Sequence, residues 1–251
     1  PILVIASLNF WRSSALSIAS AVAPIISAAA AFSAFAVVPF GASTTLFGLL
    51  DEPLRLQVAD VNVAMLVIFA VTSMGVYGIV LAGWSSNSKY SLLGGLRSSA
   101  QMISYEISYG LSFATVIMLA GSLSLTSIVD AQGEVWYIVP QIVGFLIFML
   151  AGFAETNRAP FDVVEGESEI VAGHMVEYSG MAFAMFFLAE YANIILVSTL
   201  AAVMFFGGWQ APVSSPLLDA VPPFFWLLAK VFVIVSMFLW IRATFPRYRY
   251  D

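Results

Sequence analysis

Residues 136–180 read WYIVPQIVGFLIFMLAGFAETNRAPFDVVEGESEIVAGHMVEYSG, and charge is distributed very unevenly along them. Residues 136–154 carry no charged side chain and are long enough to cross a bilayer, which takes roughly 20 apolar residues. Residues 154–180 set six acidic side chains against a single cation, Arg158. Charge beside a membrane-embedded helix is usually kept for ion or substrate handling, so we expect this acidic loop to carry function. The acids are Glu155, Asp162, Glu165, Glu167, Glu169 and Glu177.

The composition extends the apolar pattern to the whole chain. Of its 251 residues, 61% are hydrophobic and 10% are charged, whereas a soluble domain carries about 25% charged residues. The sequence therefore predicts an all-α membrane protein, with a bundle of about six transmembrane helices in a single domain over residues 1–251. The predicted spans are residues 14–39, 61–82, 100–120, 136–154, 178–206 and 222–243.

The cysteine and histidine content limits the chemistry of the chain. It has no cysteine, so it supplies no thiolate ligand for an iron–sulfur cluster, and its one histidine, His174, cannot form a haem or zinc site alone. We therefore predict no metal site in this chain, and we place any redox centre in another subunit. We assign no catalytic residue to the chain. The net charge of −6 argues against nucleic acid as a partner.

The cations predict how the chain is oriented. Short loops rich in Lys and Arg stay on the inner side of a membrane. Most of the cations lie at alternate ends of the predicted spans and therefore share one side, where we also place the acidic loop. These cations are Arg12, Lys89, Arg97, Arg158, Arg242, Arg247 and Arg249.

Three ionisable residues lie within predicted spans: Glu106, Glu190 and Lys230. A carboxyl group at that depth either takes up and releases protons or donates a hydrogen bond to a neighbouring helix, and we favour the first role. Lys230 either pairs with one of the two acids or extends to the outer boundary. We expect pairing, because acids inside a membrane need a counter-charge.

Spacing within the acidic loop suggests further pairs. Asp162, Glu165 and Glu169 share one face if the segment is helical, and like charges so close cannot all ionise without cost. Glu155 and Arg158 are three residues apart and are placed to pair across one turn. The alternative is a solvated inner loop that docks a soluble partner.

Several strings in this chain, in the order given, resemble one family. They resemble subunit 1, the H-type membrane subunit, of complex I, the proton-translocating NADH:quinone oxidoreductase of respiratory chains. The resemblance covers about residues 23–251, and ETNRAPFD and PRYRYD are its most specific parts. The strings are GWSSNSKYSLLGGLRSSAQMISYE, AETNRAPFD, ESEIVAG, VEYSG, FFLAEYAN, FFGGW and RATFPRYRYD.

The resemblance implies a non-redox subunit of an enzyme, one that joins the peripheral redox arm to the membrane arm. Such a subunit lines the quinone chamber and begins an acidic path toward the pumping subunits. Quinone is then the substrate, FMN and iron–sulfur clusters lie in partner subunits, and the other partners are membrane-arm and peripheral-arm subunits and lipids. The expected location is a bacterial or mitochondrial inner membrane.

Site residues are assigned from the charge pattern and the resemblance together. The predicted quinone-binding residues are Arg97, Arg158, Phe161, Asp162, Glu165, Glu167, Phe186 and Phe187. The predicted proton path comprises Glu106, Glu155, Glu169, Glu177, Glu190 and Lys230.

The sequence departs from the family pattern in three places. The family usually has eight spans, and the first and last have no counterpart here. The chain is therefore either naturally split or incomplete at both ends, and we expect the second. The acidic loop of the family usually reads FDLPEAE, whereas residues 161–167 read FDVVEGE, which keeps the acids but changes the backbone. His174 stands where the family usually has tyrosine.

Two other classes of protein fit parts of the pattern. A stand-alone cation or proton transporter would use Glu106, Glu190 and Lys230, but such proteins often contain inverted repeats, and we find none in this sequence. The homologous subunit of a membrane-bound hydrogenase shares the architecture. The strings ETNRAPFD and PRYRYD favour the quinone enzyme over both.

Overall fold

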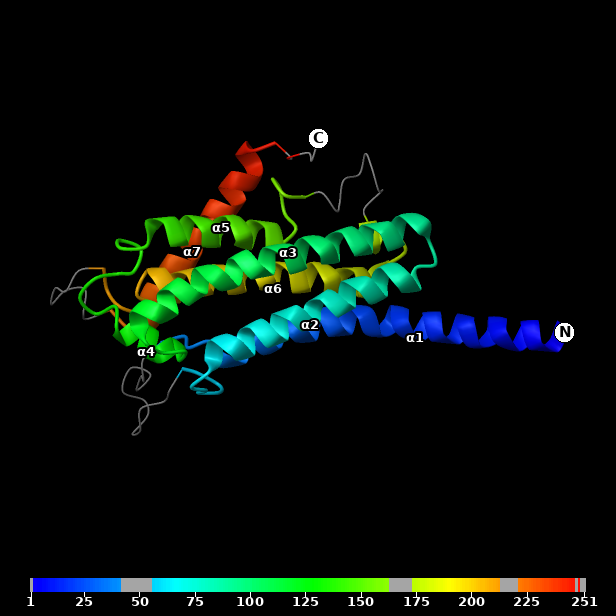
Figure 1. Cartoon of the computed structure of the whole chain (residues 1–251), viewed down its shortest axis with the longest axis horizontal. Coiled ribbons are helices and arrows are strands. Elements are labelled where there is room, and N and C mark those ends of the chain that lie inside the picture. Colours follow the sequence, from blue (N-terminus) through cyan, green and yellow to red (C-terminus); the bar gives the residue numbers. More distant parts are fainter. Residues whose placement is uncertain (1, 42–55, 163–172, 213–220, 247, 249–251) are drawn as a thin grey trace.

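The computed structural model describes residues 2–41, 56–162, 173–212, 221–246 and 248. Within these residues the chain forms helices and turns and no strand (Figure 1). The long helices are α1 (Ile2–Ala34), α2 (Ala64–Ser85), α3 (Lys89–Ala120), α6 (Gly180–Phe205) and α7 (Pro223–Thr244). The shorter ones are η1 (Phe35–Val37), α4 (Leu125–Asp130), α5 (Ile142–Glu155) and η2 (Gly173–Met175). The all-α prediction is confirmed.

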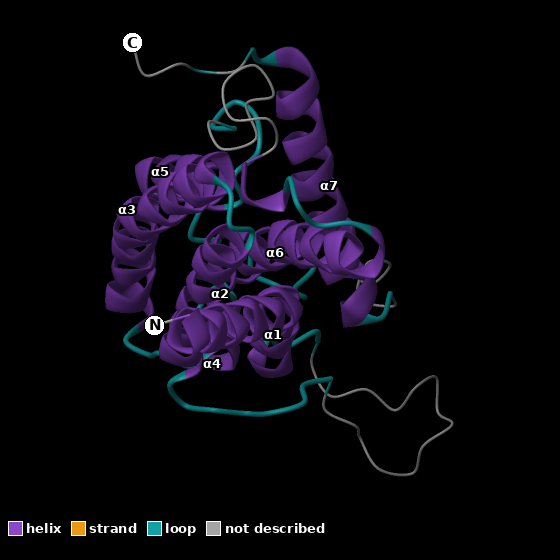
Figure 2. Ribbon diagram, turned by 90° about the vertical axis from the view of Figure 1, so that its right-hand side faces the viewer, coloured by secondary structure: helices purple, strands orange, loops and turns teal. Residues whose placement is uncertain are grey.

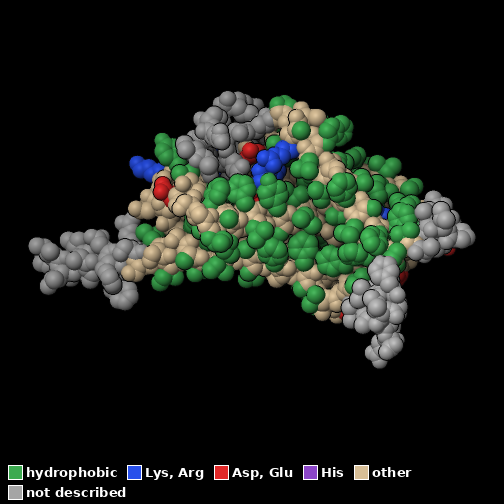
Figure 3. Space-filling model, turned by 180° about the vertical axis from the view of Figure 1, so that it is seen from behind, with side chains coloured by type: hydrophobic (Ala, Val, Ile, Leu, Met, Phe, Trp, Pro, Cys, Tyr) green, Lys and Arg blue, Asp and Glu red, His purple; other side chains and the backbone are tan. Residues whose placement is uncertain are grey.

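Five segments are long and apolar enough to cross a membrane: Ser14–Val37, Ala64–Ser85, Lys89–Ala120, Gly180–Phe205 and Pro223–Thr244. Their bounds agree with five of the six predicted spans to within a few residues, except at the start of α3. Figure 3 shows that one face of the molecule is covered largely by hydrophobic side chains with few charges, as a lipid-facing surface requires.

The sixth predicted span, residues 136–154, forms a shorter helix than expected. Helix α5 begins at Ile142 and has 14 residues, a length of about 21 Å against a hydrocarbon core of about 30 Å. Pro140 explains the late start, because it disfavours helical backbone in the residue before it. Residues 137–141 form turns instead.

Helix α3 begins earlier than predicted, at Lys89 instead of residue 100. Its Ser- and Gly-rich first third resembles a loop in sequence, yet the turn after α2 occupies only residues 86–88. Asn87 has φ 51°, in the left-handed region that asparagine tolerates better than most residues. Arg97 consequently lies on a helix and not in a loop.

Helix α6 is the central element of the bundle. Figure 2 shows it between the α1–α2 pair and helices α5 and α7, and it packs against α1, α5 and α7. Most of its second half is buried. There Phe205 packs on Phe148 of α5, whose ring also contacts Phe113 and Tyr109 of α3. This aromatic cluster fixes α3, α5 and α6 relative to one another.

Side-chain and backbone hydrogen bonds join the ends of three helices. Gln101 of α3 donates to the carbonyl oxygen of Ala154 at the end of α5, at 2.8 Å. The backbone N–H of Tyr248, beyond α7, donates to the carbonyl oxygen of Pro160, at 2.9 Å. Of the cations predicted to share a side, Lys89 and Arg97 lie in the first third of α3, Arg158 lies in the turn after α5, and Arg242 lies in the last turn of α7. That they share one side of a membrane stays a prediction.

Candidate functional site

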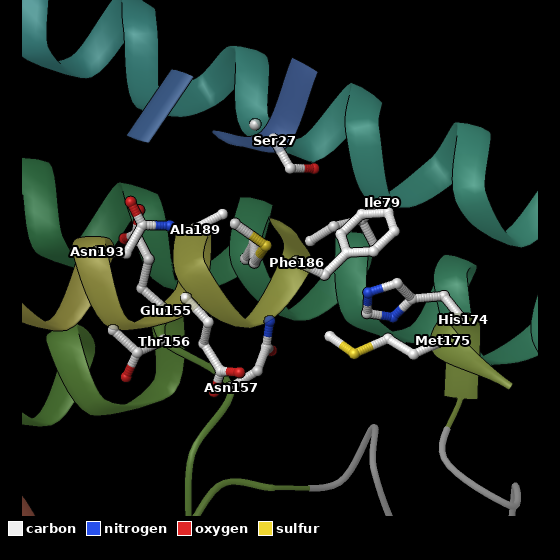
Figure 4. A pocket seen from close by; sticks show the side chains of 13 residues that line it. Ser27, Ile79, Glu155, Thr156, Asn157, His174, Met175, Phe186, Ala189 and Asn193 are labelled. Atoms are coloured by element: carbon white, nitrogen blue, oxygen red, sulfur yellow. The ribbon is translucent and has the colours of Figure 1, made fainter. Parts of the chain in front are cut away.

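A partly open cavity of about 60 Å³ lies between α1, α2, α3, α5, α6 and η2. It has room for a few water molecules, since one water needs about 10–15 Å³. Figure 4 shows Glu155 and Asn193 at one end of the cavity and His174 and Met175 at the other, with Phe186 between them. Its lining residues are Ser27, Gly75, Ile79, Met102, Glu155, Thr156, Asn157, His174, Met175, Phe186, Ala189, Glu190 and Asn193.

The charged side of this cavity contains a buried ion pair between the acidic loop and the central helix. Arg158 Nε contacts Glu190 Oε1, and the two side chains are only 7% and 13% exposed. The guanidinium also lies over the rings of Phe187 and Tyr191, 5.7 and 5.3 Å from their centroids. The pair is thus held in a largely apolar environment.

This pair corrects two predictions. Arg158 was expected to pair with Glu155, three residues away, but α5 ends at Glu155 and the following turn carries Arg158 to α6. Asn157, with φ 50°, makes that turn. Lys230 was expected to neutralise an acid in the membrane, and Arg158 supplies that charge to Glu190 instead.

Lys230 lies at the opposite end of α6 from the cavity. Its Nζ donates hydrogen bonds to the backbone carbonyls of Phe206, Gly208 and Gln210, at 2.7, 2.8 and 2.7 Å. It also lies 4.4 Å from the ring centroid of Trp136. An ammonium group has three donors, and all of them are used, so the prediction that Lys230 pairs with an acid is wrong.

Two further acids lie close together beside the ion pair. Glu155 is half-buried, and its buried Oε2 atom has no hydrogen-bond partner among the described residues. Glu106 of α3 accepts a hydrogen bond from the hydroxyl of Ser73 of α2, and it is close enough to Glu155 for the two charges to interact. Together with Glu190, three of the predicted proton-path acids therefore converge on one region.

The other end of the cavity is formed by η2. His174 is 4% exposed, and its ring packs edge-on against Phe186, with the centroids 5.6 Å apart. Burial lowers the pKa of His174 to about 4, so the imidazole is neutral at physiological pH. Tyr178 follows η2 and shares a hydrogen bond of 2.9 Å with Ser85 at the end of α2.

A close backbone contact explains how η2 is positioned. A Cβ atom at Gly94 of α3 would lie 2.6 Å from the Cα of Gly173 and 3.1 Å from the backbone nitrogen of His174. Only glycine allows α3 and η2 to approach this closely. The Gly-rich start of α3 therefore serves the site, by fixing where His174 lies.

The predicted quinone-binding residues fall in two places. Phe186 lines the cavity, and Phe187 lies beneath Arg158. Phe161 packs between Tyr105 and Tyr248 instead, and it lines a separate apolar groove of about 240 Å³ between α5 and α7.

The remaining predicted site residues lie outside the cavity or outside the described residues. Arg97 and Asp162 are half-buried and have contacts of their own. Glu177 is exposed. Glu165, Glu167 and Glu169 lie outside the described residues, so the predicted face shared by Asp162, Glu165 and Glu169 stays a prediction.

Sequence reasoning missed several polar residues of the site. Asn193 lies three residues after Glu190 and therefore on the same face of α6, a spacing that would have pointed to it. Asn157 donates a hydrogen bond of 3.1 Å to Ser98 and also lines the cavity. Ser27 and Ser73 gave no signal, because serines in apolar helices usually bond to their own backbone.

The described residues contain no group of three or more His, Cys, Asp or Glu side chains that could hold a metal ion. The acids of the site are divided between α3, α5 and α6, and one of them is paired with Arg158. This arrangement suits the handling of protons and the sensing of charge. It is not arranged as a ligand set.

These features define a multi-pass helical membrane protein with half-buried carboxyl groups beside a cavity between its helices. A family model described as NADH dehydrogenase matches residues 8–251, and the chain belongs to that family. This confirms the resemblance that the sequence strings indicated.

Curated relatives in several bacteria are about half identical to the chain. The NADH-quinone oxidoreductase subunits H of Cupriavidus pinatubonensis and Bordetella pertussis are each 52% identical to it, and that of Ralstonia pickettii is 50% identical. Each match covers 241 residues, or 92% of this chain. The chain spans 65%, 64% and 65% of the length of these relatives, respectively.

Proposed function

We propose that the chain acts as a membrane subunit of a proton-translocating NADH:quinone oxidoreductase, where it lines the quinone-binding chamber and couples quinone reduction to proton translocation. The family match and the named relatives support this role over a stand-alone transporter or a hydrogenase subunit. The chain contributes no redox centre. FMN and iron–sulfur clusters belong to partner subunits, and the assembly resides in a bacterial or mitochondrial inner membrane.

One observation carries the coupling part of the proposal. Glu106, Glu155 and Glu190 come from three different helices and lie together beside one cavity. Carboxyl groups in a poorly hydrated interior respond strongly to nearby charge, because the low dielectric screens it little. Such a cluster can take up or release protons when the charge nearby changes.

Quinone reduction supplies such a change in charge. A quinone takes up two electrons and two protons to become a quinol, and it is anionic whenever electrons arrive before protons. Arg158, at the base of the acidic loop, would be attracted to this negative charge. Its ion pair with Glu190 would then weaken, and it would strengthen again once the charge is neutralised. The acids then pass the change to Glu155 and Glu106 as a shift in their protonation.

The quinone-facing part of the chain is the loop end of the bundle. The proposed contacts there are Arg97, Asp162, Phe161, Phe186 and Phe187, with Glu165 and Glu167 of the acidic loop. Phe186 and Phe187 offer flat apolar surfaces for a quinone or its tail, and Arg158 places a cation beside them. We propose that Glu177, which is exposed, and Glu169 extend the acidic path.

The proposal is tested in the assembled enzyme reconstituted in liposomes. We expect Asp162→Asn to depress quinone reduction while the complex still assembles, and Glu106→Gln to lower the number of protons pumped per electron. Normal quinone turnover and normal pumping in both variants would count against the proposed role. Isolation of the chain with a flavin- and cluster-containing arm, and not alone as an active transporter, is the matching biochemical expectation.

A further inference from the structure

One glutamine side chain holds both ends of the turn that follows α5. Gln101 of α3 is buried, and its amide group donates hydrogen bonds to the carbonyl oxygens of Ala154 and Phe161, at 2.8 and 3.0 Å. A glutamine amide has two N–H donors, which matches the two carbonyls. The acceptors lie at the start and the end of residues 154–161, so a single side chain fixes the whole turn to α3.

Neighbouring residues of α3 extend this contact. Ser98 Oγ accepts a hydrogen bond of 3.1 Å from the side-chain amide of Asn157. The rings of Tyr105 and Phe161 also pack together, with their centroids 5.8 Å apart. Ser98, Gln101 and Tyr105 are spaced by three and four residues and therefore share one face of α3. We call these three residues the α3 clamp.

The turn that the α3 clamp holds carries Arg158. This side chain is buried, and its guanidinium contacts Glu190 of α6 and lies over the rings of Phe187 and Tyr191. The backbone carbonyl of Arg158 accepts a hydrogen bond of 2.9 Å from the N–H of Phe161, so the turn is also bonded internally. The position of the guanidinium beside α6 therefore depends on where α3 holds the backbone of the turn.

We propose that the α3 clamp positions the quinone-facing residues of this turn, and that Gln101 is the positioning residue on which the clamp depends. The inference rests on the proposed function, in which Arg158 and Phe161 lie at the quinone-facing end of the chain. Gln101 contacts neither quinone nor an acid in this account. It acts through the backbone, and without its two donors the carbonyls of Ala154 and Phe161 lose partners that burial makes hard to replace.

The neutrality of the clamp suits its surroundings. Glu155 follows Ala154 directly, and Arg158 lies within the turn. A cationic donor at position 101 would also bind the two carbonyls, but it would compete with Arg158 for nearby acids, because charges interact strongly where water is scarce. A neutral amide fixes the backbone and leaves the charged groups to respond to one another.

The first test measures the turn itself, independently of turnover. Gln101→Met keeps an unbranched side chain of similar length and removes both donors. We expect amide hydrogen exchange of residues 154–161 in the assembled complex to accelerate roughly tenfold or more, because each hydrogen bond lost is worth roughly a factor of three to ten. Unaltered exchange in these residues would overturn the proposal.

Gln141→Met is the matched control for this test. Gln141 donates a hydrogen bond of 2.8 Å to the backbone carbonyl of Thr115, so it also links α3 to α5, but at the start of α5. Its replacement removes a similar side-chain contact between the same two helices. We expect normal exchange in residues 154–161 of this variant, and acceleration equal to that of Gln101→Met would show that any loosening of α5 has the same effect and would overturn the proposal.

The second test measures quinone reduction in proteoliposomes. We expect Gln101→Met to raise KM for a short-chain quinone roughly three- to tenfold and to change kcat less, because a displaced turn weakens contacts with the substrate. Gln141→Met should leave both unchanged. Accelerated exchange with an unaltered KM would overturn the proposal, since the turn would then be loose without effect on quinone. Failure of the proposed function is seen separately, in normal turnover and pumping by Asp162→Asn and Glu106→Gln.

A conservative variant separates hydrogen bonding from packing. Gln101→Glu keeps the shape of the side chain, and its protonated carboxyl group donates one hydrogen bond in place of two. Relative to the unsubstituted enzyme at each pH, KM for quinone should be closer to normal at acidic than at alkaline pH, because ionisation removes the donor. The same KM in Gln101→Glu and Gln101→Met at every pH would overturn the role assigned to the amide.

Discussion

At the scale of single residues, the Arg158–Glu190 pair explains how an acid is kept in the centre of the bundle. A buried carboxylate without a partner is very costly, whereas a paired one is tolerated. Arg158 comes from the loop after α5 and Glu190 from α6, so the pair also ties the acidic loop to the central helix. Any change in charge near the loop acts on this pair first.

Removing one partner of this ion pair should therefore cost more stability than replacing both partners. Arg158→Ala should destabilise the protein by about 3–5 kcal/mol, because it leaves Glu190 buried and uncompensated. The double variant Arg158→Met, Glu190→Gln should lose clearly less. Unfolding in mixed micelles with increasing SDS measures both, and a double variant as unstable as the sum of the single changes would show that the two residues are not coupled.

His174 gives a pH-dependent local stability at the same scale. Its pKa falls from 6.5 in the unfolded chain to about 4 in the folded one, so between these values the unfolded segment binds a proton that the folded segment excludes. Stability is therefore fully present above pH 6.5 and decreases as the pH falls toward 4. Hydrogen exchange of residues 173–178, corrected for intrinsic rates, should accelerate in this window. His174→Phe should abolish the acceleration, and its persistence would exclude His174 as the cause.

At the scale of helices, Lys230 closes the end of α6. Backbone carbonyls in the turn that follows a helix need hydrogen-bond partners, and a cation near the C-terminal end of a helix interacts favourably with the helix dipole. Lys230 of α7 bonds the carbonyls of Phe206, Gly208 and Gln210, which follow the end of α6. Lys230 therefore links α7 to the segment that follows α6, and its assignment to a proton path stays a prediction.

This role predicts which property Lys230→Met will change. We expect a loss of stability of about 2–4 kcal/mol, from charge-assisted hydrogen bonds left unmade, with unaltered protons per electron in the molecules that assemble. Lys230→Arg should be milder. If Lys230→Met instead left SDS resistance unaltered and reduced proton pumping, Lys230 would belong to the proton path.

The contact between α3 and η2 is a second feature at the helix scale. Gly94→Ala should push η2 away and cost about 1–3 kcal/mol, because the new methyl group would meet backbone atoms that cannot rotate aside. Gly110→Ala is a matched control on the same helix, since its Cβ would make an ordinary 3.8 Å contact with Phe69. Similar thermal stability of the two variants would show that η2 tolerates displacement.

At the scale of the whole molecule, the sequence predicts the helices better than it predicts their contacts. Long apolar runs have few alternatives to helix in a membrane, so five spans lie where they were expected. Proline and glycine were less reliable guides to where helices begin. Pro140 shortened α5. The Gly-rich segment before residue 100 looked like a loop, but it is helical, and its glycines allow close packing against neighbouring backbone.

In the candidate site, too, the sequence did not predict contacts between residues that are distant in sequence. Composition and position pointed to Glu106, Glu155 and Glu190, because acids in apolar surroundings are rare. The partners of these acids did not follow from the sequence. Arg158 is 32 residues from Glu190 in sequence, and Ser73 is 33 from Glu106, so only the packing of the helices brings them together.

The central claim is that buried carboxyl groups around this cavity couple quinone reduction to proton movement. The most direct measurement is the number of protons pumped per electron, and the rate of quinone reduction, for Glu155→Gln in the reconstituted complex. Glu134→Gln, an exposed acid between α4 and α5, is the control. We predict that Glu155→Gln lowers pumping and coupled turnover at least tenfold, equivalent to about 1.4 kcal/mol or more in activation free energy, while the control stays normal. A Glu155→Gln enzyme with unaltered rate and unaltered protons per electron would contradict the account.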